Sequence, residues 1–345
     1  MRCRLLCASF WTHRRLVYLI LALALLPRLG VAIWLGDTMD ELPAGGTHDQ
    51  ISYDMLAHRV AQGHGFTFPV RWYPWVEPDT PTSYYSGTMV MTLAVIYFVF
   101  GYHPLLARLL FVIIGVLTCY LIYLVTDLVF GKRAAIVSLL TSSFYSYLIV
   151  YSATLLTETP FIFGLILSIY QAFKLSVSYS RARLAVLGLA LAITVVFRMA
   201  VVPFVLVLLV WLVLHQRHSD GRLRFEVIII PMAAIVMAVL PWAVRNYLLF
   251  NRFMLLESQF GHVFWNANHP DQGYVFREVA WVAPLPPELL HLNEVDLTNQ
   301  LLRLGIAEVL RDPGRFLALT ISRTALFFRF WPSSDSSAIS NLARI

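Results

Sequence analysis

Charged residues are scarce in this chain, and cysteines are scarcer. Only 13% of its 345 residues are charged, whereas 59% are hydrophobic and the mean hydropathy is +0.69. A soluble globular protein does not have this balance, so the composition predicts an all-α, polytopic membrane protein. The three cysteines offer no disulfide framework and lack the spacing of a zinc site, because two lie in the basic N-terminal tail and one inside an apolar run: Cys3, Cys7 and Cys119.

The signature motifs of several enzyme classes are also missing. The chain has no GxxxxGK[ST] loop, no HExxH and no GxSxG. Gly63-His64-Gly65 precedes no nucleotide-binding helix and is interpreted as a turn. His48 beside Asp49 is a single pair and weak evidence for a metal ligand, so a solvent-facing histidine is the favoured interpretation. We therefore expect no metal site, although divalent metal dependence stays open.

The chain does contain long apolar runs. Eight of them are candidate membrane spans across about 30 Å of hydrocarbon. A further run, Gly87–Phe100, reaches only about 21 Å at about 1.5 Å per residue. We therefore expect a bundle of about eight transmembrane helices, formed by Leu16–Gly36, Leu105–Phe130, Ala134–Ala153, Thr159–Leu175, Leu184–Phe197, Val201–Leu214, Val227–Val244 and Phe316–Phe330.

The basic residues predict the orientation of these spans. The formal net charge is +6, but most Lys and Arg lie in short segments between apolar runs, which favours membrane orientation over nucleic-acid binding. If Gly87–Phe100 lies in the interface without crossing, these segments and the N-terminus all become cytoplasmic. The expected organisation is a cytoplasmic tail 1–15, a transmembrane module 16–247 that includes an outer loop 37–103, an outer loop 248–315, a last span 316–331 and a C-terminal tail 332–345.

The first outer loop carries the most informative segment, an amphipathic helix that begins near Asp49 and ends near Gly63. Thr47 and Gln50 have the spacing of a capping box. An apolar stripe follows at helical spacing, and the helix dipole favours an ionised carboxylate at its first turn. A carboxylate at this position suits a base that meets a lipid-borne substrate. The stripe consists of Tyr53, Leu56, Ala57 and Val60.

Ionisable residues at the ends of the apolar runs are further candidates, because each costs about 2.5–3.5 kcal/mol inside a membrane. Glu158 and Arg198 lie at turns predicted to face outward. They form either an ion pair that braces two helices or, with Asp49, a polar cavity in which Arg198, together with Arg28 or Arg108, holds a phosphate. Asp127 and Arg245 are interpreted as snorkelling residues.

The second outer loop holds a polar turn and another amphipathic helix. The turn is Trp265-Asn266-Ala267-Asn268-His269-Pro270. The helix is predicted from about Leu297 to Leu310, capped by Asp296 and stopped by Asp312-Pro313-Gly314. Its apolar face is expected to lie on the membrane or on the rest of the protein, and it comprises Leu297, Leu301, Leu304 and Leu310.

Taken in order, these segments resemble a known family. The order begins with Asp49-x-x-x-Tyr53 and Gly63-x-Gly-Phe66, followed by Tyr84-Tyr85 and a span with Arg108. Two turns come next, Phe130-Gly131-Lys132-Arg133 and Leu156-Thr157-Glu158. The last motif is Pro241-Trp242-Ala243-Val244-Arg245-Asn246-Tyr247, which precedes the loop with Asn266 and Asn268. This order is similar to that of GT-C glycosyltransferases of the protein O-mannosyltransferase and aminoarabinose transferase type. The resemblance extends over nearly all of 16–331.

The resemblance implies an inverting transferase in the bacterial inner (plasma) membrane. The donor would be a sugar on polyprenyl phosphate, the acceptor a glycan, a lipid or a protein, and the reaction extracytoplasmic, with no further cofactor. Asp49 would be the catalytic base, with Glu158 as a second acidic residue. Arg198, Arg71 and Arg108 would contact the donor phosphate. The substrate cavity would include Tyr53, Tyr84, Tyr85, Asn266 and Asn268.

Two departures leave alternatives open. Relatives often carry Lys or a Pro-Pro pair where this chain has Thr80-Pro81-Thr82-Ser83-Tyr84, so a phosphate contact is either absent or supplied by Arg71. Relatives also continue with more spans, whereas this chain stops soon after Phe330-Trp331-Pro332, as expected of a short member, a truncated product or an inactive one. The alternatives are a non-catalytic relative that binds lipid-linked sugar and a secondary transporter.

Overall fold

The described residues fold mainly into helices. The computed structural model describes residues 2–39, 49–72, 76–220, 224–275, 283–328 and 331. Within these ranges the β-structure consists of an isolated bridge between Thr67 and Pro81. The all-α class is thus confirmed. The α-helices are α1 (Arg2–Leu35), α2 (Asp49–Ala61), α3 (Gly87–Phe100), α4 (Pro104–Phe130), α5 (Lys132–Phe144), α6 (Ser146–Ala153), α7 (Glu158–Val177), α8 (Arg181–Phe197), α9 (Val202–Asp220), α10 (Glu226–Phe250), α11 (Gln259–Asn268), α12 (Glu294–Arg311) and α13 (Pro313–Phe327).

Five of the described helices are long and apolar enough to cross a membrane, which confirms a polytopic membrane protein. They lie in α1, α4, α7, α9 with its preceding turn, and α10. A sixth span is possible if α5 and α6 act together, although the two are bent by 54°. Eight spans were expected. The difference arises because α8 has 17 residues and α13 has 15, which reach only about 26 and 22 Å.

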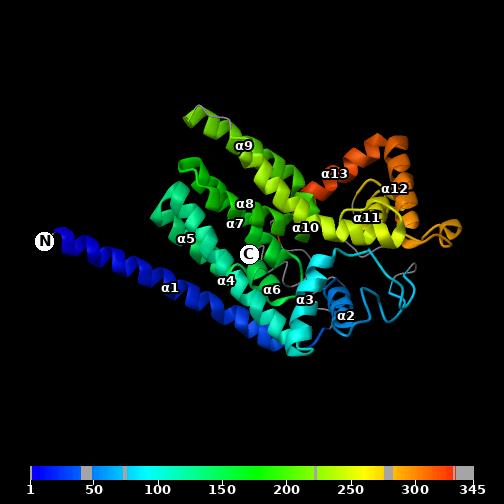
Figure 1. The fold of residues 1–345 in the computed structure, drawn as a ribbon, viewed down its shortest axis with the longest axis horizontal. Coiled ribbons are helices and arrows are strands. Elements are labelled where there is room, and N and C mark those ends of the chain that lie inside the picture. The colour runs from blue at the N-terminus through cyan, green and yellow to red at the C-terminus, as the bar shows by residue number, and fades with distance from the viewer. Residues whose placement is uncertain are drawn as a thin grey trace. The chain divides into compact units, whose positions relative to one another are not determined.

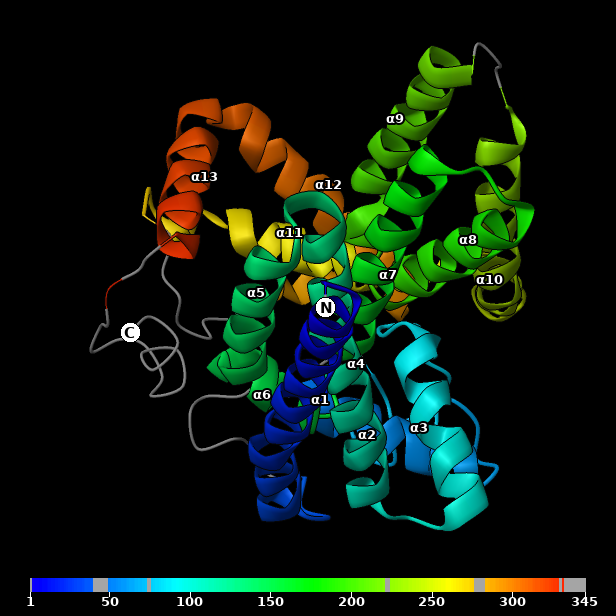
Figure 2. The ribbon, with the colours of Figure 1, turned by 90° about the vertical axis from the view of Figure 1, so that its left-hand side faces the viewer.

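The chain divides into two compact units. Unit 1 comprises Met1–Asp54 and Thr92–Pro241, and unit 2 comprises Met55–Met91 and Trp242–Ile345. The boundary falls inside α2, α3 and α10. In unit 1, α1 packs along α4 and α5 (Figures 1 and 2). Two apolar clusters hold these helices together, one containing Val17, Cys119 and Leu139 and the other containing Ala32, Val112 and Ala153.

Arg28 explains how the break between α5 and α6 is accommodated. The last carbonyls of a helix have no partner within the helix, and an unsatisfied carbonyl in hydrocarbon costs several kcal/mol. The fully buried guanidinium of Arg28 donates to the carbonyls of Ser142 and Ser143, at 3.1 and 2.7 Å, where α5 ends. It also donates to Ala24 and Cys119. The alternative role of Arg28 as a phosphate ligand is therefore not what the structure shows.

Arg108 has the same function at two other helix ends of unit 1. Its buried guanidinium donates to the carbonyl of Ala153, the last residue of α6, at 2.8 Å. It also donates to the carbonyls of Gly36 and Thr38, which follow α1, at 3.0 and 2.6 Å. All three donor nitrogens of the group are thus committed to the backbone. Arg108, expected to contact a donor phosphate, instead caps helices.

Unit 2 is organised around the contact of α11 with α12. Trp265, Leu297 and Leu301 form its buried core with Ala283. Gly261 permits this close approach, because a Cβ built there would lie 2.0 Å from the carbonyl oxygen of Thr298.

The predicted helix in this unit begins earlier than expected. The N-cap of α12 is Asn293, whose side chain accepts a hydrogen bond from the backbone of Asp296, so the expected cap at Asp296 is wrong. The stop at Asp312 is confirmed, and α13 starts at the next residue. Leu297 and Leu301 are buried, but Leu304 and Leu310 are exposed, so the predicted apolar face is only half used for packing.

Candidate functional site

Asp49 is the first residue of α2 and therefore lies in its first turn, as the sequence predicted. Its side chain is half-buried, close to the positive end of the helix dipole, which favours the ionised form. Three residues of the predicted apolar stripe, Tyr53, Leu56 and Ala57, are buried, and Val60 is half-buried. The capping residue Thr47 and the neighbouring His48 lie outside the described residues. Tyr53, expected in a substrate cavity, is largely inaccessible.

A second carboxylate of α2, which the sequence analysis missed, anchors the helix. Asp54 is buried and accepts hydrogen bonds from the hydroxyls of Tyr97 at 2.7 Å and Tyr102 at 2.9 Å. Burial, followed by the neighbouring Asp54 carboxylate, raises the pKa of the Tyr102 phenol, so this hydroxyl stays a donor at neutral pH. The cluster fixes the first turns of α2 within unit 1 and so holds the segment that carries Asp49.

The structure brings Glu158 and Arg198 together. Glu158 begins α7, Arg198 is the C-cap of α8, and their side chains form an ion pair. The Arg198 side chain is 46% exposed and that of Glu158 is 25% exposed, so the pair is open to solvent or to a ligand. Arg198 also donates to Thr157 at 3.3 Å. The predicted ion pair between Glu158 and Arg198, which would hold two helices together, is thus present. A shared polar cavity of this pair with Asp49 stays a prediction.

The remaining residues assigned to the donor and the substrate cavity lie in unit 2. Arg71 pairs with Glu77 at 3.1 Å on the surface. Tyr84 and Tyr85 are buried with their rings edge to face, 5.1 Å between centroids. Asn266 accepts a hydrogen bond from the backbone of Ala283 at 2.7 Å. These contacts hold Tyr84, Tyr85 and Asn266 within unit 2, and their assignment to a substrate cavity stays a prediction.

Glu294, which the sequence analysis did not single out, is the centre of a buried polar network in unit 2. One carboxylate oxygen accepts from the Thr82 hydroxyl at 2.6 Å. The other accepts from the backbone and hydroxyl of Ser83, at 3.0 and 2.8 Å, and from the Ser258 hydroxyl at 2.7 Å. The side chain is 6% exposed. Glu294 thereby fixes the turn before Tyr84 and Tyr85 to the start of α12.

Arg245 contributes to the same turn. It donates to the carbonyl of Thr82 at 2.9 Å, and its guanidinium lies over the rings of Phe66 and Trp242, 5.1 and 4.6 Å from their centroids. Such stacking is worth about 0.5–2 kcal/mol, depending on desolvation. Arg245 was expected to snorkel towards water, and that expectation is wrong because two rings and a carbonyl hold its head group inside unit 2.

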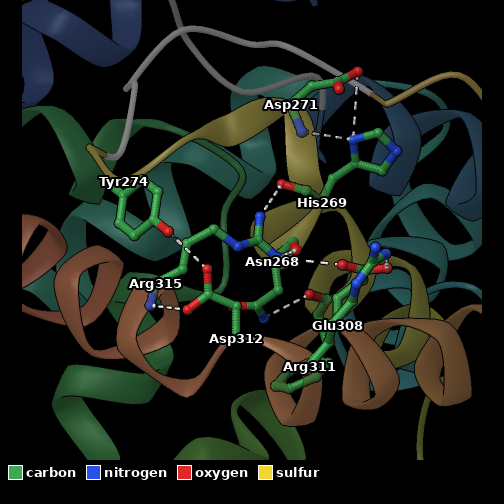
Figure 3. Close-up of polar contacts among 9 residues, drawn as sticks. Asn268, His269, Asp271, Tyr274, Glu308, Arg311, Asp312 and Arg315 are labelled. Carbon is green, nitrogen blue, oxygen red and sulfur yellow. Dashed lines mark hydrogen bonds and ion pairs between the residues drawn. The ribbon is translucent and has the colours of Figure 1, made fainter.

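Figure 3 shows a further polar network of unit 2, where the turn between α12 and α13 meets the loop after α11. Arg315 donates to the carbonyls of Asn268 and His269, both at 2.8 Å. Asp312 accepts from the backbone of Arg315 and from the Tyr274 hydroxyl, both at 2.8 Å. An open pocket of about 430 Å³ lies beside the network. Asn268, assigned to the substrate cavity, is buried and forms part of this scaffold.

His262 in α11 is a buried titratable group of the same unit. Its Nδ1 lies 3.2 Å from the Tyr84 hydroxyl, and burial lowers its pKa to about 4. An unfolded histidine has a pKa of about 6.5 and binds a proton first, so stability should fall as the pH drops from about 6.5 towards 4.

We therefore expect the free energy of unfolding to decrease by roughly 2 kcal/mol between pH 7 and pH 5 on account of His262. The expected change is a lower thermal midpoint in detergent at pH 5, measured by tryptophan fluorescence. In a His262→Gln variant this part of the pH dependence should disappear. Equal pH dependence in both proteins would show that folding does not lower the pKa of His262.

Sequence signals for the missed residues existed but were weak. Asp54 follows Asp49 by five residues in the same helix, and Tyr97 and Tyr102 flank Gly101. Glu294 lies three residues before Leu297, where the helix was expected to start. A capping pattern placed at Asn293 would have put Glu294 in the first turn, where acidic residues are favoured.

One known protein family matches part of this chain. The sequence model of the family described as dolichyl-phosphate-mannose-protein mannosyltransferase matches residues 88–244. This segment contains Arg108, Glu158 and Arg198, while Asp49 and Glu294 lie outside it. The match confirms the resemblance to a mannosyltransferase-like protein of the GT-C superfamily and indicates a membrane glycosyltransferase. No curated protein and no solved structure gave a match.

Proposed function

We infer that this protein transfers a sugar from a polyprenyl-phosphate carrier to a glycan, lipid or protein acceptor on the extracytoplasmic face of the membrane. The observation that carries this proposal is the mannosyltransferase family match over 88–244, a segment that holds the partly exposed Glu158–Arg198 pair. An ion pair that remains accessible at two helix ends can exchange its partner for a phosphate, which a fully buried pair cannot do without desolvation loss.

The proposed reaction is a single displacement that inverts the anomeric carbon. The acceptor hydroxyl oxygen forms the new bond to the anomeric carbon as Asp49 takes its proton. The bond between the anomeric carbon and the carrier phosphate oxygen breaks, and its electron pair leaves with the phosphate. Arg198 stabilises the charge that develops on the departing phosphate, and Glu158 orients Arg198. The reaction requires the lipid-linked donor and no further cofactor.

The proposed orientation follows from the basic helix ends. Arg14 and Arg15 lie near the start of the apolar span in α1, and Lys132 and Arg133 lie at the start of α5. Such residues favour the cytoplasmic side. Glu158 follows the bent α5–α6 segment and is therefore assigned to the opposite side, with the N-terminus cytoplasmic. The inner membrane of a bacterium remains the proposed location.

The direct test is transfer of radiolabel from a panel of polyprenyl-phosphate sugars in membranes that contain the protein. We expect at least one donor to label an endogenous glycan, lipid or protein, and the labelled fraction identifies the acceptor class. Absence of transfer from every donor, with retained binding of a lipid-linked sugar, would instead support a non-catalytic relative.

The Arg198→Gln variant should show whether Arg198 acts in sugar transfer or only in the ion pair that joins α7 and α8. Because the pair is partly exposed, its contribution to stability is expected to stay below about 1 kcal/mol. Loss of a phosphate contact should lower transfer by about 10²–10³-fold, and Arg198→Lys should retain part of the activity because it keeps the charge without the bidentate geometry. Initial transfer rates and thermal midpoints measure the two effects.

The Arg252–Asp296 pair of unit 2 supplies the matched control. Its side chains are 51% and 30% exposed, similar to those of the Arg198–Glu158 pair. Arg252→Gln should therefore give a similar small change in stability and near-normal transfer. If Arg198→Gln behaves like Arg252→Gln in both measurements, Arg198 has no role in donor binding.

A further inference from the structure

A cavity of unit 1 lies outside the proposed transfer site, at the other end of its helices. It has a volume of about 280 Å³ and is formed by α1, α4 and the first residue of α5. This volume is close to the lower end of the ~300–1,000 Å³ typical of small-molecule sites. The cavity combines basic, acidic and aromatic side chains, namely His13, Arg14, Asp127, Lys132, Tyr120 and Tyr123.

The ends of the adjoining spans place this cavity at the level of lipid headgroups. The apolar span in α1 begins at His13, the span in α4 ends at Phe130, and α5 begins at Lys132. Figure 2 shows α1, α4 and α5 side by side. Tyrosines and basic residues at a span end are typical of the membrane interface, and the basic residues favour the cytoplasmic leaflet. A ligand that reaches this cavity from the bilayer is therefore a lipid.

The walls of the cavity are preorganised. The His13 ring nitrogen Nε2 lies 2.9 Å from the Tyr123 hydroxyl, which joins α1 to α4. Tyr120 and Tyr123 stack with ring centroids 6.0 Å apart and an angle of 10°. Asp127 follows Tyr123 by four residues, so both lie on the same face of α4. Val17, which is buried, and Leu124, which is half-buried, add an apolar wall suited to the first carbons of an acyl chain.

We propose that this cavity binds the headgroup of a zwitterionic phospholipid that carries a phosphate and a primary ammonium, as in phosphatidylethanolamine. Arg14 and Lys132 supply positive charge for the phosphate. The Asp127 carboxylate accepts hydrogen bonds from the ammonium, and the neighbouring tyrosine rings attract the same cation. An anionic headgroup would satisfy Arg14 and Lys132 but would meet the Asp127 carboxylate unfavourably. This site does not depend on the proposed transferase activity.

Native mass spectrometry of the purified protein can test the proposal. The probes are phosphatidylethanolamine, phosphatidylcholine and phosphatidylglycerol with identical acyl chains, added to the detergent-solubilised protein. We expect phosphatidylethanolamine to be retained most strongly. In the Asp127→Asn variant, the preference for phosphatidylethanolamine over the other two lipids should fall roughly tenfold, because a charge-assisted hydrogen bond is lost. Lys132→Gln and Arg14→Gln should weaken retention of phosphatidylethanolamine and phosphatidylglycerol alike, since both lipids carry the phosphate.

Neighbouring residues that do not line the cavity provide controls. Arg15→Gln and Arg133→Gln remove the same charge one residue away and should leave the lipid preference unchanged. Thermal midpoints of all variants show whether a loss of binding reflects misfolding; His13→Gln serves as a second probe if Asp127→Asn does not fold. Equal retention of the three lipids by the wild-type protein, stronger retention of phosphatidylglycerol, or an unchanged preference in folded Asp127→Asn would each overturn the proposal.

Discussion

An Asp49→Asn variant is expected to insert and fold normally but to lose sugar transfer by about 10²–10⁴-fold. Asparagine has the same shape as aspartate, yet its amide cannot take a proton from an acceptor hydroxyl. Asp49 is half-buried at the first turn of α2, where the helix dipole keeps a carboxylate ionised and so able to act as a base. The rate of transfer per inserted molecule, with the best donor from the panel, is the quantity to measure.

Asp79→Asn is the matched control for this experiment. Asp79 lies in the same predicted outer loop, pairs with Arg59 on the surface, and has a positive φ of 59°. Asparagine tolerates this left-handed conformation well, so the control should fold and retain transfer. Transfer at the wild-type rate by Asp49→Asn, at equal expression, would exclude Asp49 as the base.

Glu294→Ala is expected to destabilise the protein by about 3–5 kcal/mol. The carboxylate accepts from Thr82, Ser83 and Ser258 in a site that water reaches poorly. The hydroxyls can rotate towards other acceptors, but the backbone N–H of Ser83 cannot. In the alanine variant, Arg245 would also lose its favourable electrostatic interaction with the Glu294 carboxylate. Chemical unfolding in detergent, monitored by tryptophan fluorescence, measures the change.

Two milder variants show whether the acceptor or the charge matters. Glu294→Gln keeps one acceptor oxygen and should lose less stability than Glu294→Ala. Ser258→Ala removes one donor and should lose about 1 kcal/mol. Glu308→Ala, in the same helix, removes a partly exposed carboxylate with ion pairs at 3.7 and 3.8 Å and should change stability by less than about 1 kcal/mol. Equal stability of Glu294→Ala and Glu308→Ala would contradict a central role for Glu294.

The sequence was most informative where the evidence is local. Gly87–Phe100 was expected as a short apolar element, and α3 has those bounds. The helix with Asp49 at its start ends at Ala61, close to the predicted Gly63. These predictions succeeded because helix periodicity and glycine turns depend on residues within a few positions of one another.

The roles of single ionisable residues were predicted less well. Arg28, Arg108 and Arg245 were assigned to phosphate binding or snorkelling, but the structure directs each towards carbonyls. A buried arginine needs several acceptors, and apolar runs do not reveal which carbonyls a helix break will leave unsatisfied. The 54° bend between α5 and α6 occurs at Tyr145, where no proline or glycine marks it.

The amino-acid sequence by itself determined an all-helical membrane protein, the order of its apolar helices, and a resemblance that the match over 88–244 confirms. Span length and side-chain periodicity are properties of contiguous residues, so they can be recognised without a fold. Only the tertiary structure decided that Glu294 meets Thr82, 212 residues away, and that Arg198 meets Glu158, 40 residues away. Such pairs depend on how helices pack, because a polar group in a poorly hydrated interior is stable only where the fold supplies its partner.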